Sequence, residues 1–255
     1  MDPATSLLAG HAAGKLIDHV AGQFRVHVIE RWTKKRAQLF FEQFCQEVAA
    51  GTSERFEDYL SKIFENETCS EVLYDAYRSV CLTKSKTLGP RIIAVQTAEL
   101  LLQNRQAEYV EQTIFEVAEQ MTDEEIAECV EFIEQQRRHA DNPEHKSVNY
   151  TKSGESIEIE WGKEQCDSNW HRETDLSLAP LDLVRDLGNW AAKAKATGML
   201  SDDVKERKWE YPEDCERFDP EPGSVREVSW WLYLHPPCLQ FVKIVNKIQT
   251  ATENP

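Results

Sequence analysis

Residues 225–234, which read VREVSWWLYL, carry the strongest strand pattern in this chain. β-Branched and aromatic side chains alternate along the segment, so Trp230, Leu232 and Leu234 are expected to share one face of a sheet. Trp231 follows Trp230 directly and is expected to point to the opposite face. The segment therefore predicts a small sheet in which one tryptophan is part of the core and the other is available for contact.

Further strands and two helices are predicted around this segment. Residues 148–161 alternate on both sides of the turn sequence KSGE (152–155), which is typical of a β-hairpin, and Glu158 and Glu160 would then share one face. Residues 205–211 have the same alternation. Residues 181–196 are predicted to form a helix, and Pro236 and Pro237 to begin the last one.

The order of these elements over residues 176–248 resembles that of a winged-helix unit: a helix, a long hairpin and a closing helix. The resemblance implies a small α+β winged-helix-like domain, a fold that serves DNA binding in some proteins and protein contact in others. A capped helical stack followed by such a tail also resembles bacterial accessory proteins, including phage-defence proteins.

Residues before about 140 follow a helical period instead. Apolar side chains recur three and four positions apart and predict a series of helices, the first at 7–24 and the second at 26–50. The capping-box sequences TCSE (68–71) and TDEE (122–125) mark two helix starts. We therefore predict a mostly α protein with an N-terminal multi-helix bundle (1–140), followed by a winged-helix-like domain with an N-terminal β-hairpin (146–255).

Composition limits the function classes. The 255 residues include 45 Asp and Glu against 29 Lys and Arg, a net charge of −16, which repels phosphate backbones and disfavours nucleic acid as a partner. The seven cysteines are odd in number and widely spaced, so reduced thiols in a cytoplasmic protein are expected. Neither a secretion signal nor a membrane span is predicted.

Two groups of residues are candidates for nucleic-acid binding. The first is a short basic run in the second helix. It comprises Arg31, Lys34, Lys35 and Arg36. The second is the outward side of the helix at 181–196, which a winged helix would place in a groove. It comprises Arg185, Asn189, Lys193 and Lys195. Aspartates on the same helix oppose that interpretation, and a solvated helical turn is the simpler interpretation of the basic run.

Metal chemistry has two candidate sets. Cys166, His171, His235 and Cys238 supply the ligand types of a Cys2His2 zinc site, although the spacing is not standard and buried thiols are the simpler interpretation. Glu158, Glu160 and Lys163 resemble the acid and lysine clusters of metal-dependent nucleases, but the spacing departs from the usual order and solvated charges on a hairpin are favoured. No cofactor is predicted.

Phosphate-binding glycine loops and nucleophile motifs do not occur in the sequence, so no catalytic residue is named. We therefore predict a non-catalytic regulatory or protein-interaction protein that binds a protein partner or itself. Trp230, Trp231 and Tyr233 are the candidate contact residues, because aromatic side chains are enriched at the centres of interfaces. A winged-helix DNA-binding regulator and a metal-dependent nuclease are the alternatives.

Overall fold

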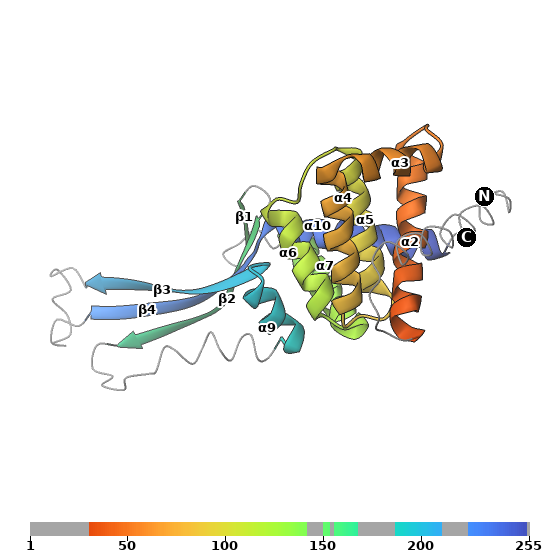
Figure 1. Ribbon diagram of the computed structural model, residues 1–255. Helices are drawn as coiled ribbons and strands as arrows, with labels where there is room; N and C mark the ends of the chain where they lie inside the picture. Colours follow the sequence, from red (N-terminus) through yellow and green to blue (C-terminus); the bar gives the residue numbers. More distant parts are fainter. Residues whose placement is uncertain (1–30, 142–149, 154–155, 168–186, 211–223, 254–255) are drawn as a thin grey trace, which may run out of the picture. The chain divides into compact units, whose positions relative to one another are not determined.

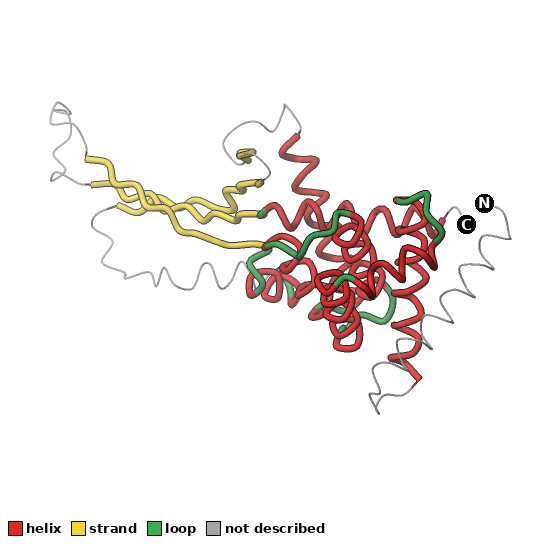
Figure 2. The backbone as a smooth tube through the Cα atoms, turned by 45° about the horizontal axis from the view of Figure 1, so that its top comes forward, coloured by secondary structure: helices red, strands yellow, loops and turns green. Residues whose placement is uncertain are grey.

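The computed structural model describes residues 31–141, 150–153, 156–167, 187–210 and 224–253 (Figure 1). Its helices are α2 (Arg31–Gly51), α3 (Phe56–Glu65), α4 (Glu67–Leu82), α5 (Leu88–Leu102), α6 (Tyr109–Gln120), α7 (Asp123–Asp141), α9 (Asn189–Ala196) and α10 (Pro236–Glu253). Its strands are β1 (Tyr150–Ser153), β2 (Ser156–Asp167), β3 (Leu200–Glu210) and β4 (Ser224–Leu234). The prediction of a mostly helical protein with a small antiparallel sheet is confirmed (Figure 2). The helix predicted at 7–24 lies outside the described residues.

The chain divides into two compact units. The first contains the described residues up to Val130 and those from Gln240 onward, and the second runs from Glu131 to Leu239. We call them the helical unit and the sheet unit. The C-terminal part of α10 belongs to the helical unit, where the Gln240 side chain donates to Gln96 Oε1 at 3.1 Å. The domain boundaries 1–140 and 146–255 stay a prediction.

Helix α5 is the centre of the helical unit, and α2, α4 and α6 pack around it. Apolar residues lie on all sides of α5, and Ile92, Val95 and Leu100 are fully buried. A helix that is apolar all round has to be enclosed by other helices. Nearly the whole circumference of α5 is therefore core.

Two helix starts in this unit are capped in ways that the sequence pattern did not predict. Helix α4 starts at Glu67, and its cap is Asn66, whose side chain accepts from the Cys69 N–H at 3.3 Å. Helix α5 starts with its first N–H groups bonded to Asp123, which accepts from Leu88 N at 2.8 Å. By contrast, the TDEE capping box is confirmed: Thr122 N donates to Glu125, and Glu125 N donates to Thr122 Oγ1.

The sheet has the strand order β1-β2-β4-β3, with every neighbouring pair antiparallel. The predicted hairpin is present as β1 and β2, and the strand predicted at 225–234 is β4, which is central. The register shifts between Glu160 and Gly162, where β2 bulges. The helix predicted at 181–196 begins at Asn189 in the described part, because Gly188 has φ +95° and lies outside the helix.

Candidate interaction surface on the sheet

Strand β4 divides its side chains between the two faces of the sheet. Trp230, Leu232 and Leu234 lie on one face, and Leu232 and Leu234 are fully buried there. Ile157 and Leu200 are the partners of Leu234 in the neighbouring strands and are also buried. This inner face is the core of the sheet unit, as the alternation of residues 225–234 predicts.

The opposite, outer face carries the aromatic side chains Trp231 and Tyr233, both half-buried. Residues that pair across antiparallel strands share a face, so the register places further side chains beside these rings. Tyr233 lies between Glu158 and Ser201, Trp231 lies between Glu160 and Asp203, and Ser229 lies opposite Lys205. We call these eight residues the outer face: Glu158, Glu160, Ser201, Asp203, Lys205, Ser229, Trp231 and Tyr233.

Lys205 connects the polar and aromatic parts of the outer face. Its Nζ lies 4.0 Å from the ring centroid of Trp231 and 5.5 Å from that of Tyr233. Trp231 is held by a second contact, because its Nε1 donates to Ser229 Oγ at 2.8 Å. A hydrogen bond with Tyr233 raises the pKa of the Lys205 ammonium group, and the nearby carboxylates of Glu158 and Asp203 act in the same direction.

The outer face is acidic as well as aromatic. Among the side chains that the structure describes, Glu158, Glu160 and Asp203 contribute three carboxylates to this face and Lys205 contributes one ammonium group, and the carboxylates are half-buried or exposed. Asp203 also accepts from the Val204 N–H at 2.8 Å, so its position on the edge strand β3 is fixed. Such a surface attracts positively charged groups and offers them aromatic rings as well as carboxylates.

The inner face holds two buried polar atoms that have no hydrogen-bond partner within the described residues. They are Nε1 of Trp230 and Oδ2 of Asp202. The other carboxylate oxygen of Asp202 forms an ion pair with Lys195 of α9, which ties that helix to β3. The Trp230 side chain as a whole is half-buried, although its N–H group is covered. Neither Trp230 nor Trp231 is fully enclosed by the described chain.

A serine–histidine contact, which the sequence pattern did not predict, joins β3 to the start of α10. Ser201 Oγ and His235 Nε2 lie 2.8 Å apart, and burial lowers the pKa of His235. A hydrolase would need donors for a developing oxyanion near this pair. Pro236 and Pro237 begin α10 and have no N–H to supply, and Cys238 N is bonded to His235 O. The contact therefore fits a structural link between strand and helix.

The sheet register separates the proposed zinc ligands. Cys166 pairs with Arg226, which lies eight residues and about 26 Å along the strand from Leu234, the residue before His235. The Cys238 thiol is fully buried and donates to the Met199 carbonyl at 3.0 Å, and burial raises its pKa, which disfavours the thiolate that zinc requires. His171 lies outside the described residues.

The residues of the proposed nuclease set all lie on strand β2. Glu158 and Glu160 lie on the outer face beside Tyr233 and Trp231, and Lys163 pairs with Ser229 beyond the bulge. Among the residues that the structure describes, no group of three His, Cys, Asp or Glu side chains is placed to hold a metal ion.

The basic run of α2 that is predicted for nucleic-acid binding is partly exposed and partly buried among the side chains that the structure describes. Lys34 and Lys35 of α2 are exposed, but Arg36 is only 6% exposed and burial lowers its pKa. Arg31 is the first residue of α2.

The second predicted set lies on or near the short helix α9. Asn189 is exposed and Lys193 is half-buried, while Lys195 is held by the carboxylate of Asp202. Because that ion pair already neutralises its charge, Lys195 is less available to a phosphate group. Arg185 lies outside the described residues.

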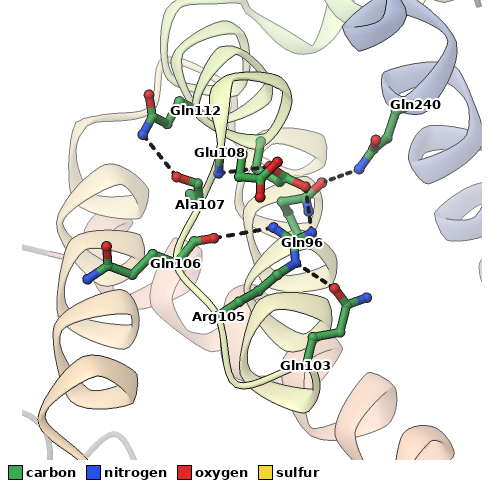
Figure 3. Close-up of polar contacts among 9 residues, drawn as sticks. Gln96, Gln103, Arg105, Gln106, Ala107, Glu108, Gln112 and Gln240 are labelled. Atoms are coloured by element: carbon green, nitrogen blue, oxygen red, sulfur yellow. Dashed lines mark hydrogen bonds and ion pairs between the residues drawn. The ribbon is translucent and has the colours of Figure 1, made fainter.

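A polar cluster in the helical unit joins the α5–α6 loop, α5 and α10 (Figure 3). Arg105 donates to Glu111 at 2.6 Å, and Glu111 also accepts from Glu108 N, which completes the capping box of α6. Gln96 is fully buried, accepts from Gln240 and keeps an Nε2 without a hydrogen-bond partner in the described structure. These contacts fix the α5–α6 loop and the last helix, which explains the cluster by folding alone.

Comparisons of the chain with family models, with curated proteins and with solved structures found no match. None of the helices in the described part is both long and apolar enough to span a membrane. The functional conclusion therefore depends on the geometry of the chain itself, and the outer face of the sheet is its most distinctive surface.

Proposed function

We propose that this protein is a non-catalytic interaction protein whose outer sheet face docks a basic segment of a partner protein. The observation that carries the proposal is the combination of two half-buried aromatic rings, Trp231 and Tyr233, with three carboxylates on one face. Aromatic side chains are enriched at interface centres, and charge complementarity gives specificity and fast association. The net charge of −16 adds long-range attraction for a basic partner.

The winged-helix-like arrangement supports protein contact better than DNA binding. We infer such a module from the order α9, β3, β4 and α10, with β3 and β4 forming the long hairpin. Its helix α9 carries Lys195, whose charge is neutralised by Asp202, and the sheet beside it presents acidic side chains. DNA binding needs the opposite charge balance, because phosphate contacts supply much of the affinity.

Calorimetric titration with a short peptide of alternating lysine and glycine tests the proposal. We expect micromolar or weaker binding that diminishes with added salt, and no binding of the matching glutamate peptide. Replacing both carboxylates, Glu158→Gln with Glu160→Gln, should weaken binding by roughly 5-fold or more. The matched control Glu65→Gln with Glu71→Gln removes two exposed acids from α3 and α4 and should leave the affinity unchanged within about 2-fold.

Two results would overturn the proposal. One is equal weakening of peptide binding by the two double variants, because net charge rather than the outer face would then govern the affinity. The other is binding of duplex DNA in preference to the lysine peptide at the same ionic strength, which would favour the DNA-binding regulator instead.

A further inference from the structure

The ammonium group of Lys205 lies where a ligand cation would bind to the outer face. It is within cation–π range of two rings at once, 4.0 Å from Trp231 and 5.5 Å from Tyr233. Lys205 is opposite Ser229 in the register, so its side chain reaches along the sheet toward the tryptophan. A single positive charge is thereby placed between two aromatic rings that are two residues apart on one strand.

The backbone of both aromatic residues and the ring of Trp231 are positioned without help from the lysine. Trp231 is fixed by its hydrogen bond to Ser229 at 2.8 Å, and both aromatic residues belong to the central strand β4, which is paired on both sides. Lys205 itself is exposed and is on the edge strand β3, so its flexible stem can leave the rings while the sheet stays intact. The site therefore remains formed when the lysine moves away.

The surroundings select an organic cation. Glu158 pairs with Tyr233 and Asp203 pairs with Trp231, so a carboxylate flanks each ring. Aromatic faces attract alkylammonium groups, which keep favourable contact with the ring after losing water, whereas small metal cations hold their water shell. Carboxylates beside the rings add Coulomb attraction for either lysine or a quaternary ammonium group.

We propose that Trp231 and Tyr233 form a binding site for one alkylammonium group, which Lys205 fills in the unbound protein and a lysine side chain of the partner fills in the complex. This inference deepens the proposed function and rests on it for the identity of the partner. Lys205 acts as an internal competitor, so its removal strengthens binding of an external cation. The strength of an exposed cation–π contact predicts a gain of roughly 2- to 5-fold.

Tetramethylammonium chloride is the probe, with sodium chloride at equal concentration as the reference. The indole N–H resonances of the full chain are followed by NMR, and Trp231→Leu identifies the Trp231 signal. We expect tetramethylammonium to shift that signal, and Lys205→Met to lower the dissociation constant by roughly 2- to 5-fold. Lys243→Met, which removes an exposed lysine from α10, should leave the constant unchanged.

The outcomes separate this inference from the proposed function. A Trp231 shift that strengthens in Lys205→Met supports the cation site even if the lysine peptide does not bind, in which case only the docking proposal fails. Peptide binding that depends on Glu158 and Glu160, together with tetramethylammonium affinity that is equal in wild type and Lys205→Met, overturns the cation site and leaves docking intact. Far-UV circular dichroism establishes that each variant is folded.

Discussion

Two aromatic clusters in this protein have opposite surroundings. In the helical unit, Phe40, Phe41 and Phe44 are completely buried, and the rings of Phe40 and Phe44 stack with their centroids 5.9 Å apart. In the sheet unit, Trp231 and Tyr233 remain half-buried, next to a lysine and several carboxylates. The first arrangement gains stability by removing apolar surface from water, whereas the second leaves that surface available to another molecule.

The comparison predicts that removing a ring lowers stability in the helical unit and lowers affinity in the sheet unit. Phe44→Ala leaves a cavity among fully buried rings and should lower the free energy of unfolding by about 3–5 kcal/mol, measured by urea denaturation. Phe64→Ala is the matched control, because Phe64 is 39% exposed, and it should cost less than about 1 kcal/mol. Equal losses in the two variants would show that the phenylalanine cluster is not the core of the helical unit.

A polar contact in the helical unit should show the next largest effect. Asp123 accepts hydrogen bonds from the Ser85 hydroxyl at 2.5 Å and from the N–H groups of Lys86, Thr87 and Leu88. Burial alone would raise the pKa of Asp123, but these bonds outweigh it and hold the pKa below its ordinary value. Asp123→Asn removes the charge that strengthens all four bonds and should cost about 2 kcal/mol at neutral pH.

The direction of the pKa shift fixes the pH dependence. Because the pKa of Asp123 is lower in the folded than in the unfolded chain, its stabilisation is complete above the ordinary value of about 4 and is lost as the pH falls through the folded pKa. Urea denaturation of wild type and Asp123→Asn from pH 7 downward should show the difference between them shrinking below about pH 4. If the difference in unfolding free energy stays constant over this pH range, the ionised form of Asp123 is not the source of the stabilisation.

Truncation in the sheet unit should affect binding more than folding. Trp231→Leu removes a half-buried ring, its cation–π contact and one hydrogen bond, so we expect a loss of unfolding free energy near 1 kcal/mol. Affinity for the lysine peptide should fall by roughly 10-fold, because the ring is central to the outer face. If Trp231→Leu lost as much unfolding free energy as Phe44→Ala and kept its affinity for the lysine peptide, Trp231 would be a core residue rather than a binding residue.

The smallest effect is expected at an exposed ion pair of the helical unit. Lys247 of α10 pairs with Glu47 of α2, but the lysine side chain is 52% exposed and water screens the attraction. Lys247→Met should therefore change the free energy of unfolding by less than about 1 kcal/mol in urea denaturation. A much larger loss would mean that this contact, rather than apolar burial, holds the last helix in the helical unit.

The sequence predicted the local elements well, because they depend on patterns within a few residues. The alternation in residues 225–234 identified strand β4, and the sequence TDEE identified the start of α7. The cap of α5 was not predictable in this way, since Asp123 lies more than thirty residues after the N–H groups it binds. The start of α9 also differed, because Gly188 has a positive φ and lies outside the helix, which begins at Asn189 in the described part.

The candidate surface was predicted only in part, for a similar reason. Trp231 and Tyr233 were identified from alternation within one strand. Lys205 and Asp203 were missed because the register of β3 against β4 decides which side chains lie beside the rings. The same register places Cys166 far from His235, which spacing in the sequence could not reveal.

Fluorine NMR of the chain labelled with 5-fluorotryptophan tests the central claim most directly, because Trp230 and Trp231 are adjacent in sequence and lie on opposite faces of the sheet. During titration with the lysine peptide, the resonance of Trp231 should shift most, while those of Trp230 and the buried Trp190 change little. A Trp231 resonance that does not move when the peptide binds, or a larger shift at Trp230, would contradict docking on the outer face.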